Sequence, residues 1–256
     1  MFPPLGALPQ WLATNNYRVP SGSKECPFQD GKNTDLDAFG YLTQFPEKAR
    51  STFEYMAWQK VRNQGWMDGS VRIADELQLC DQDVANGRAL LVDVGGGGGH
   101  QCVEFRGAFP ERKGKVIVQD TEVMIGMVDK SALERVDVEP MAHDFFTPQP
   151  VKGAKAYYLR TVLHDWNDET AIEILKQLRG AMAEDSLVVL DEIVVPKKGA
   201  GEKLMLYDVT MMAALGASER SEEQWRSIFD AAGLRLRNVA IYDQELNSAL
   251  VIAVKA

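Results

Sequence analysis

One stretch restricts the fold of this 256-residue chain more than any other: an apolar segment with an acidic residue that runs into five consecutive glycines. It reads LVDVGGGGGH over residues 91–100, and the residues after it, 101–109, can form a helix. Glycines at a strand-to-helix turn let a ligand approach the backbone, because no Cβ stands in the way. The first N–H groups of the helix are free to bind a polar group. This pattern favours a nucleotide or nucleoside site over a flexible surface loop.

The spacing of the glycines separates three kinds of nucleotide site. The dinucleotide fingerprint requires G-x-G-x-x-G/A, but the sixth position counted from Gly95 is His100. The phosphate-binding loop ends in Gly-Lys-Ser/Thr, and no lysine follows these glycines. What remains is the acidic strand and Gly-x-Gly loop of S-adenosylmethionine-dependent methyltransferases. That ligand carries no phosphate, so it requires neither a lysine nor a strong anion cradle.

Composition argues against several classes of protein. A net charge of −9 is unlike that of proteins that bind nucleic acid or anionic membranes through a basic face. The cysteines at 26, 80 and 102 are too widely spaced for a disulfide framework, and the histidines lack zinc spacing. No signal peptide or long apolar run is present. We therefore expect a cytoplasmic protein with no bound metal, no nucleic-acid partner and no membrane partner.

The order of the expected elements indicates an α/β fold. Residues 1 to about 35 have the composition of a connecting segment without a helical period, and residues 35–86 have a helical pattern that Pro46 interrupts. Strands and helices then alternate, which predicts a parallel sheet covered on both faces and one antiparallel strand inserted at its edge. The expected strands are 90–94, 116–119, 136–142, 156–159, 187–195, 234–241 and 249–254. The expected helices are 101–109, 122–130, 168–183 and 221–232.

Polar and aromatic side chains follow successive strands of this sheet. Ligands of open α/β sheets bind beyond the carboxyl ends of the strands. The second strand leads to Asp120, whose carboxylate can accept hydrogen bonds from both hydroxyls of a ribose. The third leads to Asp144, an acceptor for an adenine amino group, and to Phe145, a flat apolar wall. Their succession favours a nucleoside site.

The fourth strand is followed by a candidate general base. His164 precedes Asp165 just before a helix, so Asp165 is a neighbouring group that can orient it. Glu192 on the fifth strand and Glu219 in a later turn can flank the imidazole, fix its tautomer and favour its protonated form. Ser221 also fits a helix N-cap, so part of this polar cluster has an ordinary structural use.

Together these motifs resemble the catalytic part of the class I O-methyltransferases of the plant caffeate and fungal secondary-metabolite type. The matching segments are VDVGGG (92–97), QD (119–120), HDFF (143–146), LHDW (163–166), DEIVVP (191–196) and ERS (219–221). The resemblance implies a Rossmann-like, seven-stranded, mostly parallel sheet. It divides the chain into a linker and helical substrate-side extension, residues 1–86, and an S-adenosylmethionine-binding domain, residues 87–256.

The resemblance also implies which residues form the site. The cofactor would bind along Asp93, Gly95, Gly96, Gly97, Asp120, Asp144, Phe145 and Arg160, the last being the basic residue near the adenosine. His164 would be the base, positioned by Glu192 and Glu219. We expect substrate contacts from Phe53, Met56, Asp208 and Met212.

The expected reaction is methyl transfer to a phenolic or enolic hydroxyl of a small aromatic or polyketide-like secondary metabolite. A cofactor-retaining pericyclase or dehydratase of the same fold is one alternative. A non-catalytic cofactor-binding remnant is another, because the family's N-terminal winged-helix dimerisation domain is not found in this sequence. The same difference leaves homodimer formation open. A metal-dependent catechol-type enzyme would need a clustered carboxylate–amide metal site, whereas His164 stands where the metal-free family has its base.

Overall fold

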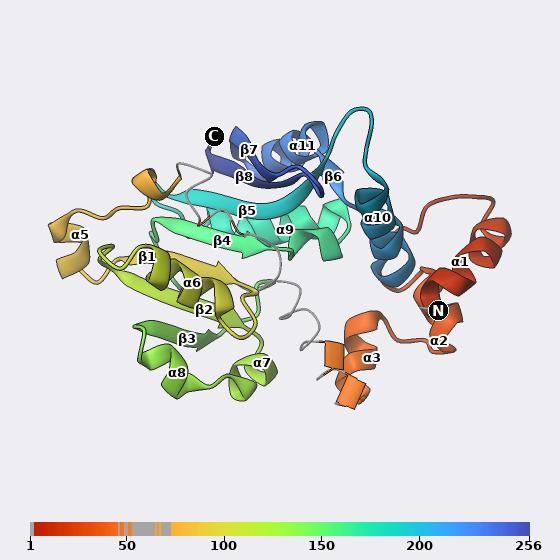
Figure 1. Cartoon of the computed structure of the whole chain (residues 1–256), viewed down its shortest axis with the longest axis horizontal. Helices are drawn as coiled ribbons and strands as arrows, with labels where there is room; N and C mark the ends of the chain where they lie inside the picture. The colour runs from red at the N-terminus through yellow and green to blue at the C-terminus, as the bar shows by residue number, and fades with distance from the viewer. Residues whose placement is uncertain (1–2, 46, 49–50, 53–64, 66, 68–72) are drawn as a thin grey trace.

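The structure is a computed structural model that describes residues 3–45, 47–48, 51–52, 65, 67 and 73–256. Its main sheet has the strand order β3-β2-β1-β4-β5-β8-β7 (Figure 1). The strands are β1 Ala89–Val94, β2 Lys115–Asp120, β3 Val138–Ala142, β4 Ala156–Arg160, β5 Leu187–Val195, β7 Leu234–Asp243 and β8 Ser248–Lys255. Strands β1 to β5 pair in parallel, which confirms the Rossmann-like, mostly parallel sheet.

Two details of the sheet differ from the sequence expectation. The antiparallel strand β8 lies between β5 and β7, so it is inserted one strand in from the edge. A two-residue strand, β6 (Arg220–Ser221), pairs in parallel with the end of β5 and makes the sheet eight-stranded. It is too short to produce the alternating apolar pattern by which strands are recognised in a sequence.

The helices differ from the expectation mainly in their bounds. They are α1 Pro3–Thr14, α2 Pro27–Lys32, α3 Ala38–Gln44, α5 Asp81–Ala85, α6 His100–Ala108, α7 Glu122–Met127, α8 Lys130–Glu134, α9 Asp168–Arg179, α10 Glu202–Leu215 and α11 Glu222–Ala232, with short 3₁₀ helices η2 Ala74–Glu76 and η3 Leu163–Asp165. The single helix expected over 122–130 is wrong. Asp129 accepts a hydrogen bond from the backbone N–H of Ala132 and so starts a second helix, α8.

The connecting segment expected over residues 1 to about 35 is also wrong, because it contains α1 and α2. Prolines at positions 3 and 4 lie in the first turn of α1, where their missing N–H groups would have no partner in the helix. Both helices pack on each other and on α10. This tertiary packing, rather than a helical period, stabilises them.

Two apolar layers enclose the sheet. On one face, α9 and α11 pack against side chains such as Val92 and Leu159. On the other, α6 and α8 pack against side chains such as Tyr158 and Val118. Among the described residues, no helix is both long and apolar enough to cross a bilayer.

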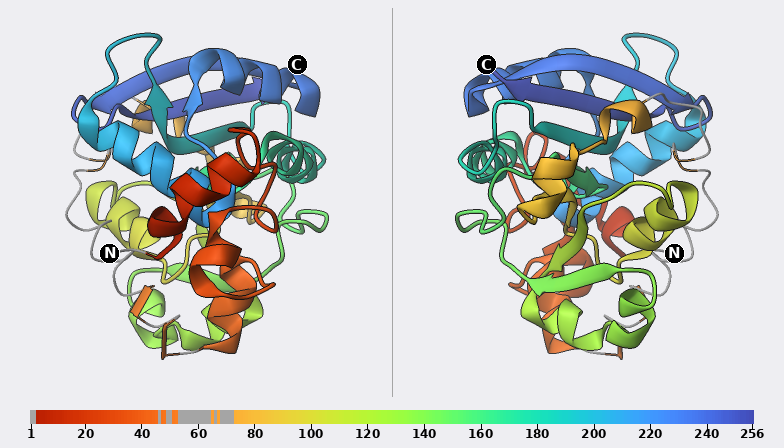
Figure 2. Two further views of the ribbon diagram at one scale, coloured as in Figure 1. Left: turned by 90° about the vertical axis from the view of Figure 1, so that its right-hand side faces the viewer. Right: turned by 90° about the vertical axis from the view of Figure 1, so that its left-hand side faces the viewer.

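The N-terminal helices lie at the end of the sheet where β1 and β4 end (Figure 1). Figure 2 shows α1 beside α10, in agreement with their contacts. Gly22 and Gly216 approach so closely that a Cβ on Gly216 would overlap the carbonyl of Gly22. Asn167, which caps α9, donates to the carbonyl of Ser21 at 2.9 Å. The N-terminal helices therefore pack against α10 and the start of α9, near the end of β4.

Candidate active site

The glycine loop connects β1 to α6 and is open on one side. The backbone N–H groups of Gly95 and Gly96 donate to the carbonyl of Gln119 at 2.8 and 3.0 Å, which fixes the loop against β2. A Cβ on Gly95 would lie 2.9 Å from the Val162 side chain, whereas a Cβ on Gly97 would meet no atom of the described residues within 4 Å. Both glycines have positive φ, 73° and 58°. The loop thus needs glycine, and the described residues leave room for a ligand beside Gly97.

Two acidic residues hold this loop from different sides. One oxygen of Asp120 accepts the N–H of Gly97 at 2.9 Å, and the other accepts the N–H of Thr121 at 2.7 Å. A carboxylate has about four lone-pair directions, so Asp120 keeps acceptor capacity for two hydroxyls. Asp93 is 1% exposed and lies beneath Gly96, where a Cβ would meet it. Asp93 therefore supports the loop from below, and Asp120 lies at its rim.

The residues after β3 form an apolar wall beside Gly95. Phe145 is half-buried, and its ring lies 3.8 Å from where a Cβ of Gly95 would stand. Asp144 is exposed, and its side chain accepts the N–H of Phe146 at 3.0 Å. Trp166 packs edge-on against both phenylalanine rings and stacks on Phe39 of α3, with ring centroids 5.5 Å apart. The aromatic wall thus joins the extension to the sheet.

Arg160 ends β4 in a buried polar cluster. Its Nη1 donates to Oε1 of Gln101 at 2.7 Å, and its Nε lies 3.5 Å from Oδ2 of Asp191. Burial lowers the pKa of Arg160, but Asp191 and its neighbours outweigh burial and raise it overall. The hydroxyls of Tyr158 and Tyr242 donate to the two oxygens of Asp191 at 2.5 and 2.6 Å. This cluster links β4, β5 and β7 to the first turn of α6.

His164 lies on η3, directly after β4, with carboxylates on both sides of its ring. Nδ1 is 2.9 Å from Oε1 of Glu219 and 4.0 Å from Oε2 of Glu192. Nε2 is 3.3 Å from Oδ1 of Asp165. The structure therefore brings together the three residues expected to form the catalytic group, His164, Glu192 and Glu219.

These charges set the protonation of the cluster. Burial lowers the pKa of His164, but Glu219, Asp165 and Glu192 outweigh burial and raise it to about 10. Burial raises the pKa of Glu192 to about 7, although His164 opposes that shift. Oε2 of Glu192 and Oε2 of Glu219 are buried without a hydrogen-bond partner in the described part of the chain. The cluster thus strongly favours the imidazolium form of His164.

The same three side chains have their ligand atoms within 4.8 Å of one another, a spacing that a metal ion could also bridge. The direct contact between Nδ1 and Glu219 already occupies the inner imidazole nitrogen, however. In the structure these side chains form an ion-pair cluster centred on His164.

The structure describes two of the four residues that were expected to contact substrate. Phe53 and Met56 lie outside the described residues. Met212 is half-buried on α10, which contacts η3. Asp208, also on α10, accepts the backbone N–H of Glu219 at 2.9 Å. In the structure, Asp208 is thus hydrogen-bonded to the backbone of Glu219, a residue of the catalytic cluster.

Sequence reasoning missed several residues of the site. Trp166 completes the aromatic wall by stacking on Phe39, and the buried Arg220 binds the backbone on both sides of His164. Asp191 gathers the cluster around Arg160. Their place in the sequence could have indicated them, because Trp166, Asp191 and Arg220 lie within the LHDW, DEIVVP and ERS motifs.

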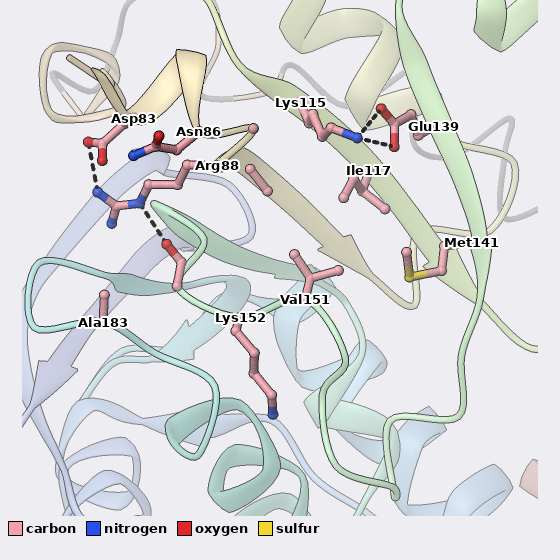
Figure 3. A pocket seen from close by; sticks show the side chains of 13 residues that line it. Asp83, Asn86, Arg88, Lys115, Ile117, Glu139, Met141, Val151, Lys152 and Ala183 are labelled. Atoms are coloured by element: carbon pink, nitrogen blue, oxygen red, sulfur yellow. Dashed lines mark hydrogen bonds and ion pairs between the residues drawn. The ribbon is translucent and has the colours of Figure 1, made fainter. Parts of the chain in front are cut away.

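A hollow of about 610 Å³ lies at the end of the sheet opposite the glycine loop (Figure 3). It is lined by the first residues of β1 and β2, Ala89 and Lys115. Two of its cationic side chains are paired with acids: Arg88 binds Asp83 at 3.1 Å, and Lys115 binds Glu139 at 3.0 Å (Figure 3). Because ligands of such sheets bind at the carboxyl ends of the strands, we place the site at the glycine loop.

Comparison with known proteins agrees with this geometry. The sequence profile of the family described as O-methyltransferase domain matches residues 26–235. The O-methyltransferase okaF of Penicillium ochrochloron is 36% identical over 99% of this chain and 65% of its own length. The demethylsterigmatocystin 6-O-methyltransferase of Aspergillus flavus is 36% identical over 97% of this chain and 62% of its own length.

Solved structures give the same result. LepI in complex with SAM matches with a TM-score of 0.89 and 34% identity, over 99% of this chain and 64% of that one. OxaC in complex with sinefungin and meleagrin matches with a TM-score of 0.87 and 27% identity, over 100% of this chain and 64% of that one. This chain thus spans less than two thirds of the length of these relatives. It belongs to the family of O-methyltransferase domains.

Proposed function

We propose that this protein is an S-adenosylmethionine-dependent O-methyltransferase that acts on a phenolic or enolic hydroxyl. The observation that carries the proposal is the pairing of His164 with Glu219, 2.9 Å apart, next to an open glycine loop. Val162 links the two, because it lies two residues before His164 and against Gly95. A proton acceptor and the exposed backbone of the glycine loop thus meet at one edge of the sheet.

The residues of the loop fit S-adenosylmethionine. The space above Gly97 admits a ligand to the backbone, and Asp120 at the rim retains acceptor positions for a ribose diol. Phe145 offers an apolar face beside Gly95. Bound there, the cofactor would supply an activated methyl group, so the chain's own tasks are alignment and the removal of one proton.

The raised pKa of His164 suits the removal of a phenolic proton. A phenol has a pKa of about 10, and a free imidazole has one of about 6.5. With the His164 pKa raised to about 10, proton transfer from a phenol becomes nearly balanced. In the neutral ring, Nδ1–H donates to Glu219, which leaves Nε2 as the acceptor. Glu219 and Glu192 then stabilise the imidazolium that forms.

We further propose that the acceptor is a small aromatic or polyketide-like secondary metabolite. The relatives named above support this class, since one is a demethylsterigmatocystin 6-O-methyltransferase and OxaC was solved with meleagrin. The described aromatic residues beside the site, Phe39 and Trp166, suit a flat substrate.

A second candidate is a pericyclic reaction that retains the cofactor. A structure described as a pericyclic reaction enzyme matches this chain with a TM-score of 0.89 and 34% identity. Methyl transfer is favoured because the chain contains the complete set His164, Glu192 and Glu219. The two reactions differ in product: only methyl transfer releases S-adenosylhomocysteine.

Calorimetric titration of the purified chain with S-adenosylmethionine and S-adenosylhomocysteine tests the cofactor assignment, and a panel of phenols then tests transfer. We expect His164→Ala to retain S-adenosylhomocysteine affinity and to lose transfer by about 100-fold or more. Near-normal turnover in that variant would refute the role of His164. A chain that binds neither ligand would refute the cofactor assignment, and binding without transfer to any phenol would favour a non-catalytic cofactor-binding remnant.

We also propose a cytoplasmic location and no nucleic-acid or membrane partner. The cysteines at 26, 80 and 102 are free thiols, as expected in a reducing compartment. The net charge of −9 does not favour binding to polyanions. Sedimentation analysis of the purified chain distinguishes a monomer from a homodimer.

A further inference from the structure

The short turn that carries His164 is held from both sides by buried side chains. On one side, Oε1 of Glu192 accepts the N–H groups of Val162 and Leu163 at 3.2 and 3.0 Å. On the other, Arg220 donates through Nη1 to the carbonyl of Leu163 at 2.8 Å and through Nη2 to that of Trp166 at 2.5 Å. A single 3₁₀ turn has few hydrogen bonds of its own. Its orientation therefore depends on these outside partners.

Arg220 is itself fixed in place. The residue is 1% exposed, its Nε donates to Asp168 at 2.8 Å, and its guanidinium lies 5.0 Å from the ring centroid of Trp225. A planar guanidinium presents its N–H groups in a rigid fork, so it can bind two carbonyls at a set separation. A lysine ammonium at the same place would carry the charge but not the fork.

Asp208 holds the partner of the histidine in a comparable way. It lies half-buried on α10, and its Oδ1 accepts the N–H of Glu219 at 2.9 Å. Glu219 in turn contacts Nδ1 of His164. Arg220 thus holds the backbone on both sides of the histidine, and Asp208 holds the backbone of the glutamate.

We propose that Arg220 and Asp208 are positioning residues that keep His164 and Glu219 at hydrogen-bonding distance from each other. With both in place, Nδ1 stays on Glu219, and Nε2, which lies 3.3 Å from Oδ1 of Asp165, is kept as the nitrogen that accepts the proton. A displacement of about 1 Å at a reacting group can lower a rate by about 100-fold. This inference deepens the proposed function, because it rests on His164 as the base.

The test uses a readout that does not require activity. The chain has three histidines, so nitrogen NMR of the imidazole rings can follow His164 against pH. The groups that face this ring are Glu219, Glu192 and Asp165. The same samples give S-adenosylhomocysteine affinity by calorimetry and the melting temperature, which report whether each variant is folded.

Asp208→Asn retains a carbonyl oxygen for the Glu219 N–H, whereas Asp208→Ala removes the acceptor. We expect His164 in Asp208→Asn to titrate as in the wild type, and in Asp208→Ala to titrate at least about one pKa unit lower, a tenfold change in proton affinity. The control is Glu223→Gln, an exposed carboxylate paired with Lys197. Glu223→Gln should leave the His164 titration and the S-adenosylhomocysteine affinity unchanged. A titration in Asp208→Asn as low as in Asp208→Ala would show that charge, not positioning, is what Asp208 contributes.

Arg220→Lys retains the positive charge and loses the fork, so we expect the same downward shift for His164. If that variant does not fold, Asp168→Asn loosens the same guanidinium from a half-exposed position and should shift the titration in the same direction. Wild-type titration in folded Asp208→Ala and in folded Arg220→Lys or Asp168→Asn would overturn the inference. Absence of methyl transfer would refute the proposed function without affecting these titrations.

Discussion

The substitution Glu219→Gln tests the electrostatic origin of the base most directly. Glu219 is the carboxylate nearest to His164 and contributes most to raising its pKa against burial. Glutamine has almost the same shape and can still accept the Nδ1 proton, but it carries no charge. The variant thus separates the charge of Glu219 from its hydrogen bond.

The magnitude follows from the raised pKa. With a pKa of about 10, only about 0.1% of His164 is neutral at pH 7. The rate of transfer in the wild type should therefore rise about tenfold per pH unit between pH 7 and 9. In Glu219→Gln we expect the pKa to fall toward 6.5, at which about three quarters of the rings are neutral at pH 7. The variant should then show a flat pH profile above pH 7.5 and a lower maximum, because a weaker base removes the proton less readily.

The assay is single-turnover methyl transfer to a phenol from pH 6 to 10, with S-adenosylhomocysteine as the measured product. The imidazole titration gives the pKa independently. A wild-type rate that does not change between pH 7 and 9, or a variant with the same pH profile as the wild type, would refute the electrostatic reasoning. A wild-type slope of one followed by a flat variant profile would support it.

Three further predictions concern the cofactor loop and metal dependence. Asp120→Ala should weaken S-adenosylhomocysteine binding by at least about tenfold in calorimetry, since each hydrogen bond to a charged group contributes about 1.5–3 kcal/mol; unchanged affinity would remove Asp120 from the site. Gly97→Ala should lower the free energy of unfolding by about 1–2 kcal/mol through its positive φ, and Gly95→Ala by about 1–3 kcal/mol more, because its Cβ also meets Val162. If urea unfolding showed equal losses of free energy for the two variants, the packing argument for Gly95 would be wrong. Excess EDTA should leave transfer unchanged, and a loss restored by a divalent ion would favour a metal centre.

Much of the sheet could be predicted because its signals are local. The strand from Leu187 to Val195 is a continuous apolar run apart from two acids, and the structure has the same bounds. The glycine loop was recognisable because it interrupts an apolar strand. Pairing of His164 with Glu219 was expected from the resemblance, and the structure places them 2.9 Å apart.

The rest depends on contacts between distant segments. The helix from Pro3 to Thr14 has no clear period, and it is stabilised by α2 and α10. The two-residue strand β6 exists because it pairs with the end of β5, some 25 residues earlier in the chain. Asp208 was expected to face substrate, yet its visible partner is the N–H of Glu219. No spacing rule along a sequence connects such pairs.

The position of β8 has a consequence for how the chain folds. Strands β7 and β8 are joined by a short turn and can form a hairpin early, whereas β5 and β8 must first close a loop that contains α10, β6 and α11. The residue that completes the catalytic pair, Glu219, lies in that loop. We therefore expect the sheet from β1 to β5 to gain protection from hydrogen exchange before β8 does, so that the His164 turn is assembled late on the folding pathway.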